Sequence, residues 1–137
     1  MLPILPKNVA QQVQEMFNSL QAPVEMVLVD EGGDSELDTL LKEVAELNEG
    51  VSYRRASAAQ AAEFGLDASL LPAIALGGPT GYSRARFLGA PAGHEFGVLI
   101  QDIIDLSQEQ IELSDATKQY LSSLTEDVHL QVFTTPT

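Results

Sequence analysis

The spacing of apolar residues predicts a chain in which helices alternate with strands. Residues 6–20 carry apolar side chains at helical intervals, which predicts an amphipathic helix that begins at Pro6. Residues 24–30 are apolar on both faces of an extended chain, as in a strand that is covered on both sides. Residues 31–50 start as a loop and continue as a second amphipathic helix, where Ser35 followed by Asp38 resembles an N-terminal capping box. Residues 51–57 are typical of the next strand. A strand–helix–strand unit of this kind favours a right-handed crossover and parallel pairing.

The middle of the chain predicts a hairpin and a closing helix. Residues 57–78 contain a short alanine-rich helix and a strand that begins after Pro72. Turn-forming residues at 77–83 and a strand at 84–89 predict an antiparallel hairpin, and residues 89–107 predict the last helix of this unit. The predicted fold class is therefore α/β, with a mixed central sheet and helices on both faces.

The pattern starts again in the last quarter of the chain. Residues 108–127 contain a further helix with Ser114 as its N-cap, and residues 128–134 alternate as a half-buried strand does. This repeats the helix–strand order with which the chain begins, so we expect a duplicated architecture. Residues 1–107 then form a first unit. Residues 108–137 hold a linker helix and the first strand of a second, truncated unit.

The charge balance argues against two classes of partner. The chain has 20 Asp and Glu residues against 7 Lys and Arg residues, which gives a net charge of −13. Such a surface repels phosphate backbones and anionic lipids, so we expect no nucleic acid and no membrane as partners. No apolar run is long enough for a signal peptide or a membrane span, and we expect a cytoplasmic protein. Four arginines lie within residues 51–100: Arg54, Arg55, Arg84 and Arg86. They belong either to a solvated surface or to a nearly neutral face for a partner.

The residue types present offer little catalytic chemistry. There is no cysteine, so the chain can form no disulfide and perform no thiol chemistry. Acidic residues crowd residues 30–38, but they lack the spacing of a calcium loop, and the helix dipole also favours acids there. Neither His94 nor His129 has the neighbours that a ligand or base needs. Arg84 and Arg86 share a face of their strand, as an anion site or as charges that protect a sheet edge. We expect no metal and no cofactor.

Three stretches nevertheless resemble a known family. The run AEFGLDASLLPAIAL (62–76) resembles the thioredoxin superfamily around its cis-proline. The run RFLGAPAGHEFGVLIQDIIDLSQ (86–108) resembles the end of the first unit in glutaredoxin-like protein disulfide oxidoreductases, which are two fused thioredoxin units. The ending VFTTPT (132–137) resembles the strand and loop before the Cys-Pro-Tyr-Cys motif of their second unit. The same tandem arrangement forms the N-terminal domain of the alkyl hydroperoxide reductase flavoprotein subunit.

The resemblance implies a thioredoxin-like fold and assigns roles to three sets of residues. A substrate cleft would include the cis-proline position, formed by Leu71, Pro72 and Ala73. The loop that would carry the redox cysteines is vestigial here, and consists of Glu31, Gly32, Gly33 and Asp34. The approach to the missing Cys-x-x-Cys consists of Thr134, Thr135, Pro136 and Thr137.

Two functional hypotheses follow. In the first, the chain is a redox-silent fragment of a thiol–disulfide oxidoreductase, inactive alone, whose catalytic cysteines lie beyond Thr137. Its partners would be its own missing C-terminal unit, disulfide-containing proteins and, through the orphan strand, a second copy. In the second, the chain is a stand-alone, non-catalytic thioredoxin-like module that binds proteins through the loop at 31–36 and a strand edge.

Overall fold

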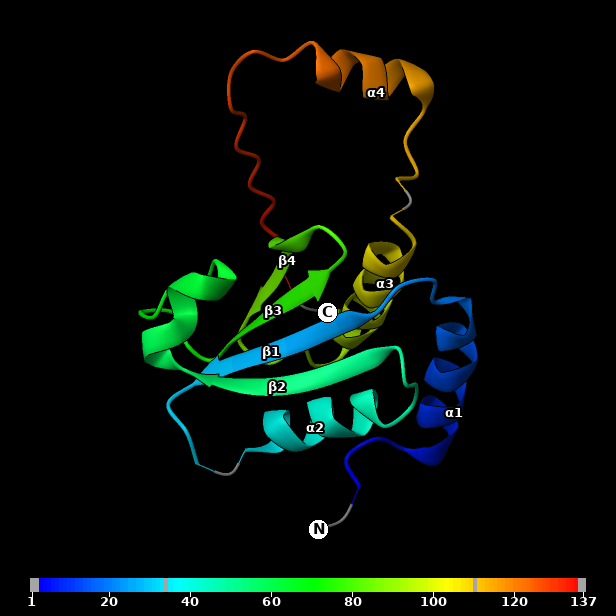
Figure 1. The fold of residues 1–137 in the computed structure, drawn as a ribbon, viewed down its shortest axis with the longest axis vertical. Coiled ribbons are helices and arrows are strands. Elements are labelled where there is room, and N and C mark those ends of the chain that lie inside the picture. Colours follow the sequence, from blue (N-terminus) through cyan, green and yellow to red (C-terminus); the bar gives the residue numbers. More distant parts are fainter. Residues whose placement is uncertain (1–2, 34, 110, 136–137) are drawn as a thin grey trace.

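The order of helices and strands follows the predicted alternation (Figure 1). The structure, a computed structural model, describes residues 3–33, 35–109 and 111–135. Its elements are α1 (Lys7–Met16), η1 (Phe17–Ser19), β1 (Val24–Asp30), α2 (Glu36–Ala45), β2 (Val51–Ser57), η2 (Ala58–Phe64), β3 (Ala73–Gly78), β4 (Gly81–Leu88), α3 (His94–Gln108) and α4 (Asp115–Ser122).

The four strands form one mixed sheet in the order β2–β1–β3–β4. β1 and β2 run parallel, with Val24 opposite Val51 and Asp30 opposite Ser57. β3 runs antiparallel to β1, and β4 runs antiparallel to β3 in the predicted hairpin. β1 is therefore an interior strand, and its residues are apolar on both faces because a core packs against each face of the sheet.

Helices cover both faces of the sheet, but in different ways. Alternate residues of β1 and β3 point to opposite faces, so each strand contributes to two cores. One core is large and lies between the sheet and α1, α2 and α3; its fully buried side chains include Phe17, Met26, Leu28, Leu41, Ile74, Leu76, Leu99 and Ile103. The other is built from smaller residues and is covered by the 3-10 helix η2; it comprises Val27, Val29, Ala56, Ala61, Phe64, Leu66, Ala73 and Ala75.

One buried serine joins the closing helix to the start of the sheet. Ser107, in the last turn of α3, is 2% exposed. Its Oγ accepts hydrogen bonds from the amides of Gln21 (2.7 Å) and Ala22 (2.8 Å) and donates one to the Ala22 carbonyl (2.7 Å). The sheet and its covering helices end with α3, at Gln108.

The segment after α3 leads away from the sheet to α4, and the chain then runs back toward the sheet (Figure 1). α4 begins as predicted, because the Ser114 side chain accepts a hydrogen bond from the Thr117 amide at 3.2 Å. Every described residue of this segment, 111–135, is exposed. The strand predicted at 128–134 is not formed: these residues have no assigned strand and pair with no other described strand. A strand needs a hydrogen-bonding neighbour, and none of the described strands pairs with these residues.

Among the described residues, no helix is both long enough and apolar enough to cross a membrane.

Candidate functional site

The predicted cleft residues and the predicted vestigial loop lie at one end of the sheet. Residues 31–33 directly follow β1, and Pro72 directly precedes β3. β1 and β3 run antiparallel with Val29 opposite Ala73, so the end of one strand meets the start of the other. The structure thus brings together two segments that are about forty residues apart in the sequence.

The segment around Pro72 is held by the sheet and by the end of β4. The Leu71–Pro72 peptide bond is cis, as the family resemblance implies. The Pro72 carbonyl accepts a hydrogen bond from the Gly89 amide at 2.8 Å, just after β4. Ala73 is fully buried and Leu71 packs against the smaller core, whereas Pro72 itself is exposed. Pro72 is therefore exposed, while the residues on either side of it pack against the smaller core.

The loop after β1 has its own internal geometry. Glu31, Gly32 and Gly33 are exposed. Gly32 and Gly33 have φ values of +89° and +85°, a region that residues with a Cβ rarely adopt. The Gly32 amide donates to Asp30 Oδ1 at 3.1 Å, which closes the turn. Asp34, the fourth predicted residue of this loop, lies outside the described residues.

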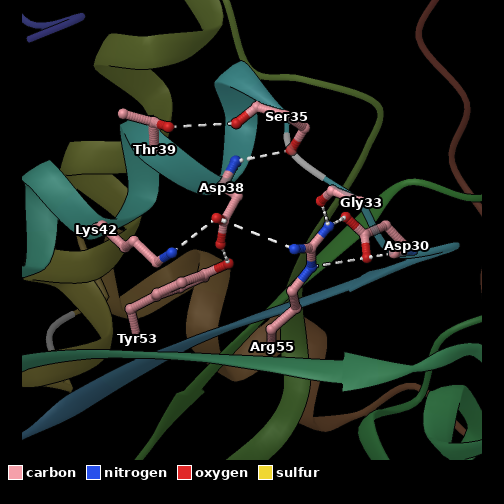
Figure 2. A network of polar contacts seen from close by, with 9 residues as sticks. Asp30, Gly33, Ser35, Asp38, Thr39, Lys42, Tyr53 and Arg55 are labelled. Atoms are coloured by element: carbon pink, nitrogen blue, oxygen red, sulfur yellow. Dashed lines mark hydrogen bonds and ion pairs between the residues drawn. The ribbon is translucent and has the colours of Figure 1, made fainter. Parts of the chain in front are cut away.

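An arginine from the neighbouring strand fixes this loop (Figure 2). Arg55 of β2 donates from Nε to Asp30 Oδ1 (3.0 Å) and from Nη2 to Asp30 Oδ2 (2.6 Å). The same Nη2 also donates to the Gly33 carbonyl at 2.5 Å. This two-point pairing matches the planar fork of a guanidinium to the two oxygens of a carboxylate. The loop connects β1 to α2 in the chain, and the Arg55 contacts tie it to β2 as well.

A second carboxylate extends the network into α2 (Figure 2). The Ser35 Oγ caps this helix by accepting a hydrogen bond from the Asp38 amide at 3.0 Å, as predicted from the sequence. Asp38 is 7% exposed as a whole residue, and its side chain accepts from Lys42 Nζ (2.8 Å) and Tyr53 Oη (2.5 Å). Arg55 Nη1 lies 4.0 Å from Asp38 Oδ2 and links the two carboxylates.

These contacts shift the ionisation of the groups that make them. The hydrogen bond from Arg55 lowers the pKa of Asp30 and outweighs the opposing effect of burial. Burial raises the pKa of Asp38, but the hydrogen bonds from Lys42 and Tyr53 outweigh it, so the net pKa is also lowered. Burial and the bond to Asp38 raise the pKa of Tyr53. At neutral pH Asp30 and Asp38 are therefore carboxylates, Arg55 is a cation and Tyr53 is a neutral phenol.

This end of the sheet carries carboxylates, an arginine and a phenol, and it carries no thiol. In a thioredoxin unit the nucleophilic thiol would stand between β1 and α2, and this chain has no cysteine. Within the described ranges no group of three or more His, Cys, Asp or Glu side chains is arranged to hold a metal ion. A shallow hollow of about 400 Å³ lies beside the loop, lined by Asp30, Glu31, Gly32, Arg55, Ala56, Ser57 and Ala58.

The other predicted positions lie elsewhere. Thr134 and Thr135 are exposed in the segment after α4, and Pro136 and Thr137 lie outside the described residues. Arg84 and Arg86 alternate along β4, so they share a face as predicted. Arg86 Nη1 donates to the Gly65 carbonyl at 2.6 Å, which assigns it a structural contact at the end of η2.

The sequence pattern does not predict the Asp30–Arg55–Asp38 network. It indicates only a solvated cluster of acids near the start of a helix. The signal that could have revealed the pairing is the parallel arrangement of the two strands: Asp30 ends β1, and Arg55 lies two residues before the end of β2. Parallel pairing places both side chains near the same sheet end.

No protein-family model matches the chain. The alkyl hydroperoxide reductase protein AhpF of Escherichia coli is 28% identical over 99 residues, which cover 71% of this chain and 18% of that protein.

Solved structures give the fold. The alkylhydroperoxide reductase protein AhpF of Enterococcus faecalis superposes with a TM-score of 0.74 at 23% identity, over 88% of this chain and 61% of that chain. The NTD_N/C domain of the same protein gives 0.75 at 22% identity, over 89% and 62%. A protein disulfide oxidoreductase from Aeropyrum pernix gives 0.71 at 22% identity, over 87% and 55%. The chain thus has a thioredoxin-like fold, as predicted, and spans less than two thirds of these relatives.

Proposed function

We propose that this chain is a redox-silent thioredoxin-like unit of a thiol–disulfide oxidoreductase, in which a second thioredoxin-like unit carries the catalytic dithiol. The observation that carries the proposal is the set of residues found where a thioredoxin unit has its redox cysteines. Between β1 and α2, Arg55 binds Asp30 and the Gly33 carbonyl, and no thiol is present. The fold is retained while the group that would exchange disulfides is replaced by an ionic network.

The similarity to known proteins supports a role in disulfide chemistry. The similar proteins are an alkyl hydroperoxide reductase and a protein disulfide oxidoreductase. This chain spans 61% and 55% of two of the similar structures, so each of them contains substantial sequence beyond the part that matches. We place the dithiol of the proposed enzyme in such an additional unit.

The chain would contribute one wall of the substrate cleft. Two large apolar side chains are exposed beside Pro72: Leu70 is 51% exposed, and Leu88, which pairs with Ala73 at the end of β4, is 57% exposed. Exposed apolar side chains next to a rigid loop suit an extended polypeptide segment. The substrate class is therefore a protein with an accessible disulfide.

The chemistry in this proposal belongs to the second unit. Its thiolate attacks one sulfur of the substrate disulfide, the other sulfur leaves as a thiolate, and a mixed disulfide forms. The second thiol of the pair then attacks the mixed disulfide, which releases the reduced substrate and leaves an oxidised enzyme. An external dithiol such as dithiothreitol returns the two electrons in the assay. The present chain binds and orients the substrate.

The test is insulin disulfide reduction by the native protein that carries this chain, with dithiothreitol as reductant. We expect activity that alkylation of the protein abolishes. Leu70→Asp should raise KM about tenfold or more, because it places a charge on an apolar contact worth roughly 1.5 kcal/mol. Val98→Asp on α3 is the matched control, since Val98 is 50% exposed at another site. A native protein without dithiol-dependent activity would overturn the proposal and favour the non-catalytic binding module.

A further inference from the structure

The segment that carries the proposed cleft wall forms a turn of its own. We define residues 65–72, which connect η2 to β3 and include Leu70 and Pro72, as the cleft segment. The Leu70 amide donates to the Asp67 carbonyl at 3.0 Å. Asp67 Oδ1 accepts hydrogen bonds from the amide (2.8 Å) and the hydroxyl (2.7 Å) of Ser69. These contacts stay within the turn, so they do not set its position relative to the sheet.

The downstream end of the cleft segment is held by the sheet. The Pro72 carbonyl accepts a hydrogen bond from the Gly89 amide at 2.8 Å, and β3 begins at the next residue, Ala73. Leu71 packs against the smaller core. This end of the segment is therefore fixed beside the end of β4.

An arginine of β4 binds the upstream end of the cleft segment. Arg86 pairs with Ala75 of β3, which belongs to the smaller core, so the Arg86 side chain projects on the η2 side of the sheet. Its Nη1 donates to the Gly65 carbonyl at 2.6 Å, and a charged donor makes a stronger hydrogen bond than a neutral one. The guanidinium also lies close to the glycine, because a Cβ at Gly65 would be 3.8 Å from Nη2 and 3.9 Å from Cζ. Arg86 therefore ties the start of the cleft segment to β4, and Gly89, just after β4, holds its end.

The helix before the cleft segment is held by contacts of its own. Phe64, the last residue of η2, is 4% exposed and belongs to the smaller core. The guanidinium carbon of Arg54, on β2, lies 4.9 Å from the centre of the Phe64 ring, and the Tyr82 ring meets it edge-on with centroids 5.1 Å apart. Loss of the Arg86 contact should therefore loosen the chain after Phe64 and leave η2 and the sheet folded.

We propose that Arg86 is a positioning residue of the substrate cleft, an inference that rests on the function proposed above. Arg86 binds the backbone at Gly65, so it acts on a substrate through Leu70 and Pro72 rather than by touching the reacting sulfurs. Without this contact the cleft segment would occupy several positions, and only some of them would present Leu70 correctly. The apparent affinity for the substrate falls with the fraction of the competent position, whereas the dithiol of the second unit is unaffected. The expected signature is a higher KM with little change in kcat.

The first test is insulin disulfide reduction by the native protein that carries this chain. Arg86→Met keeps a long side chain but removes the charged donor, and it should raise KM about threefold with little change in kcat. Arg86→Lys keeps a charged donor and should restore most of the lost affinity. Arg84→Met is the matched control, because Arg84 is an exposed arginine of the same strand and no described hydrogen bond links it to the cleft segment. A variant that was merely destabilised would lose kcat instead, because less of the protein would be folded.

The outcomes of this assay separate the role of Arg86 from the proposed function. An active wild type whose KM is unchanged by Arg86→Met, or is raised equally by Arg84→Met, would overturn the role of Arg86 and leave the proposed function standing. A fall in kcat at unchanged KM would have the same meaning. A wild type without dithiol-dependent activity would overturn the proposed function, and the role of Arg86 in the cleft with it.

The second test detects the loosened segment without turnover. Amide hydrogen exchange in the cleft segment of the native protein should become severalfold faster in Arg86→Met, because the segment opens locally more often. Exchange in β1 should stay at the wild-type rate, and Arg84→Met should leave both regions unchanged. Equal acceleration in β1 would show a loss of global stability, and unchanged exchange in the cleft segment would show that Arg86 does not hold it. Either result would overturn the positioning role.

Discussion

The Tyr53 hydroxyl donates a hydrogen bond of 2.5 Å to Oδ1 of Asp38, a carboxylate in the first turn of α2. This contact joins β2 to α2 at the place where a thioredoxin unit would present its redox cysteines. It is one of several contacts that satisfy the Asp38 side chain, and the structure contains no buried side-chain polar atom without a partner among the described residues. The end of the sheet is therefore held by a satisfied polar network.

We expect Tyr53→Phe to destabilise the chain by about 2 kcal/mol. The substitution removes a hydroxyl that binds a charged and nearly buried carboxylate, and such bonds contribute roughly 1.5–3 kcal/mol. The measurement is the free energy of unfolding from urea titration. Tyr120→Phe on α4, where the ring is 68% exposed, serves as the control and should change this value little. If the two variants lose equal stability, the Asp38 contact has no special role.

The same network predicts a dependence of stability on pH. The pKa values of Asp30 and Asp38 are lowered in the folded chain relative to about 3.9 in the unfolded chain. Their contribution is therefore fully present above the unfolded pKa and is lost as the pH falls through the folded pKa. We expect the free energy of unfolding to fall steadily below about pH 4.5.

Substitution of one carboxylate tests this assignment. Asp30→Asn should reduce the stability at pH 7 and flatten its decline below about pH 4.5, because the ionisable group is gone. Asp127→Asn changes an exposed position after α4 and should leave the wild-type profile in place. A decline in Asp30→Asn as steep as in the wild type would contradict the role given to the Arg55 contact.

Ser107→Ala should weaken the junction between α3 and the start of the sheet. The substitution leaves the Gln21 and Ala22 amides without the acceptor that they use in the folded chain. Gln21 is exposed and Ala22 is only partly buried, so water can replace part of the lost acceptor, and we expect about 1 kcal/mol of destabilisation. Urea titration of Ser123→Ala, an exposed serine after α4, supplies the comparison. Similar losses at both serines would show that the Ser107 contacts do not hold this junction.

Two glycines should respond to alanine in opposite directions. A Cβ on Gly77 would lie 2.2 Å from Cε1 of Tyr82, whose ring would have to move. This would also disturb the edge contact of Tyr82 with Phe64, where the centroids are 5.1 Å apart, and we expect a loss of about 1–3 kcal/mol. Gly97 in α3 has open space around its Cβ position, and Gly97→Ala should stabilise the chain by about 0.5–1 kcal/mol. Thermal or urea unfolding measures the change in stability of both variants. A change of the same sign in both would contradict this prediction.

Elements with strong local signals could be predicted from the sequence. Apolar residues on both faces of 24–30 indicate an interior strand, and β1 has strands on both sides. Ser35 and Ser114 are predicted N-caps, and both accept a hydrogen bond from the amide three residues later. These features depend on neighbouring residues in the chain, which is why the pattern reveals them.

Features that depend on distant partners were harder to predict. The alternation at 128–134 indicates a strand, but a strand also needs an edge to pair with, and the structure leaves these residues unpaired. The Asp30–Arg55 contact depends on the register between β1 and β2, which no local pattern specifies. The family resemblance placed Pro72 at the cis-proline position, whereas periodicity alone showed only a proline at the start of a strand, and the structure shows the bond as cis.

The most direct test of the proposed function places a photo-crosslinking residue on the proposed cleft wall. A benzophenone amino acid is installed at Leu70 of the native protein that carries this chain, and at Val98 as the control of similar exposure. Insulin is added under reducing turnover, and the illuminated products are separated by mass. We expect insulin chains attached at position 70 and little attachment at position 98. Equal attachment at both positions, or attachment at position 98 alone, would contradict the claim that this redox-silent unit forms part of the substrate cleft.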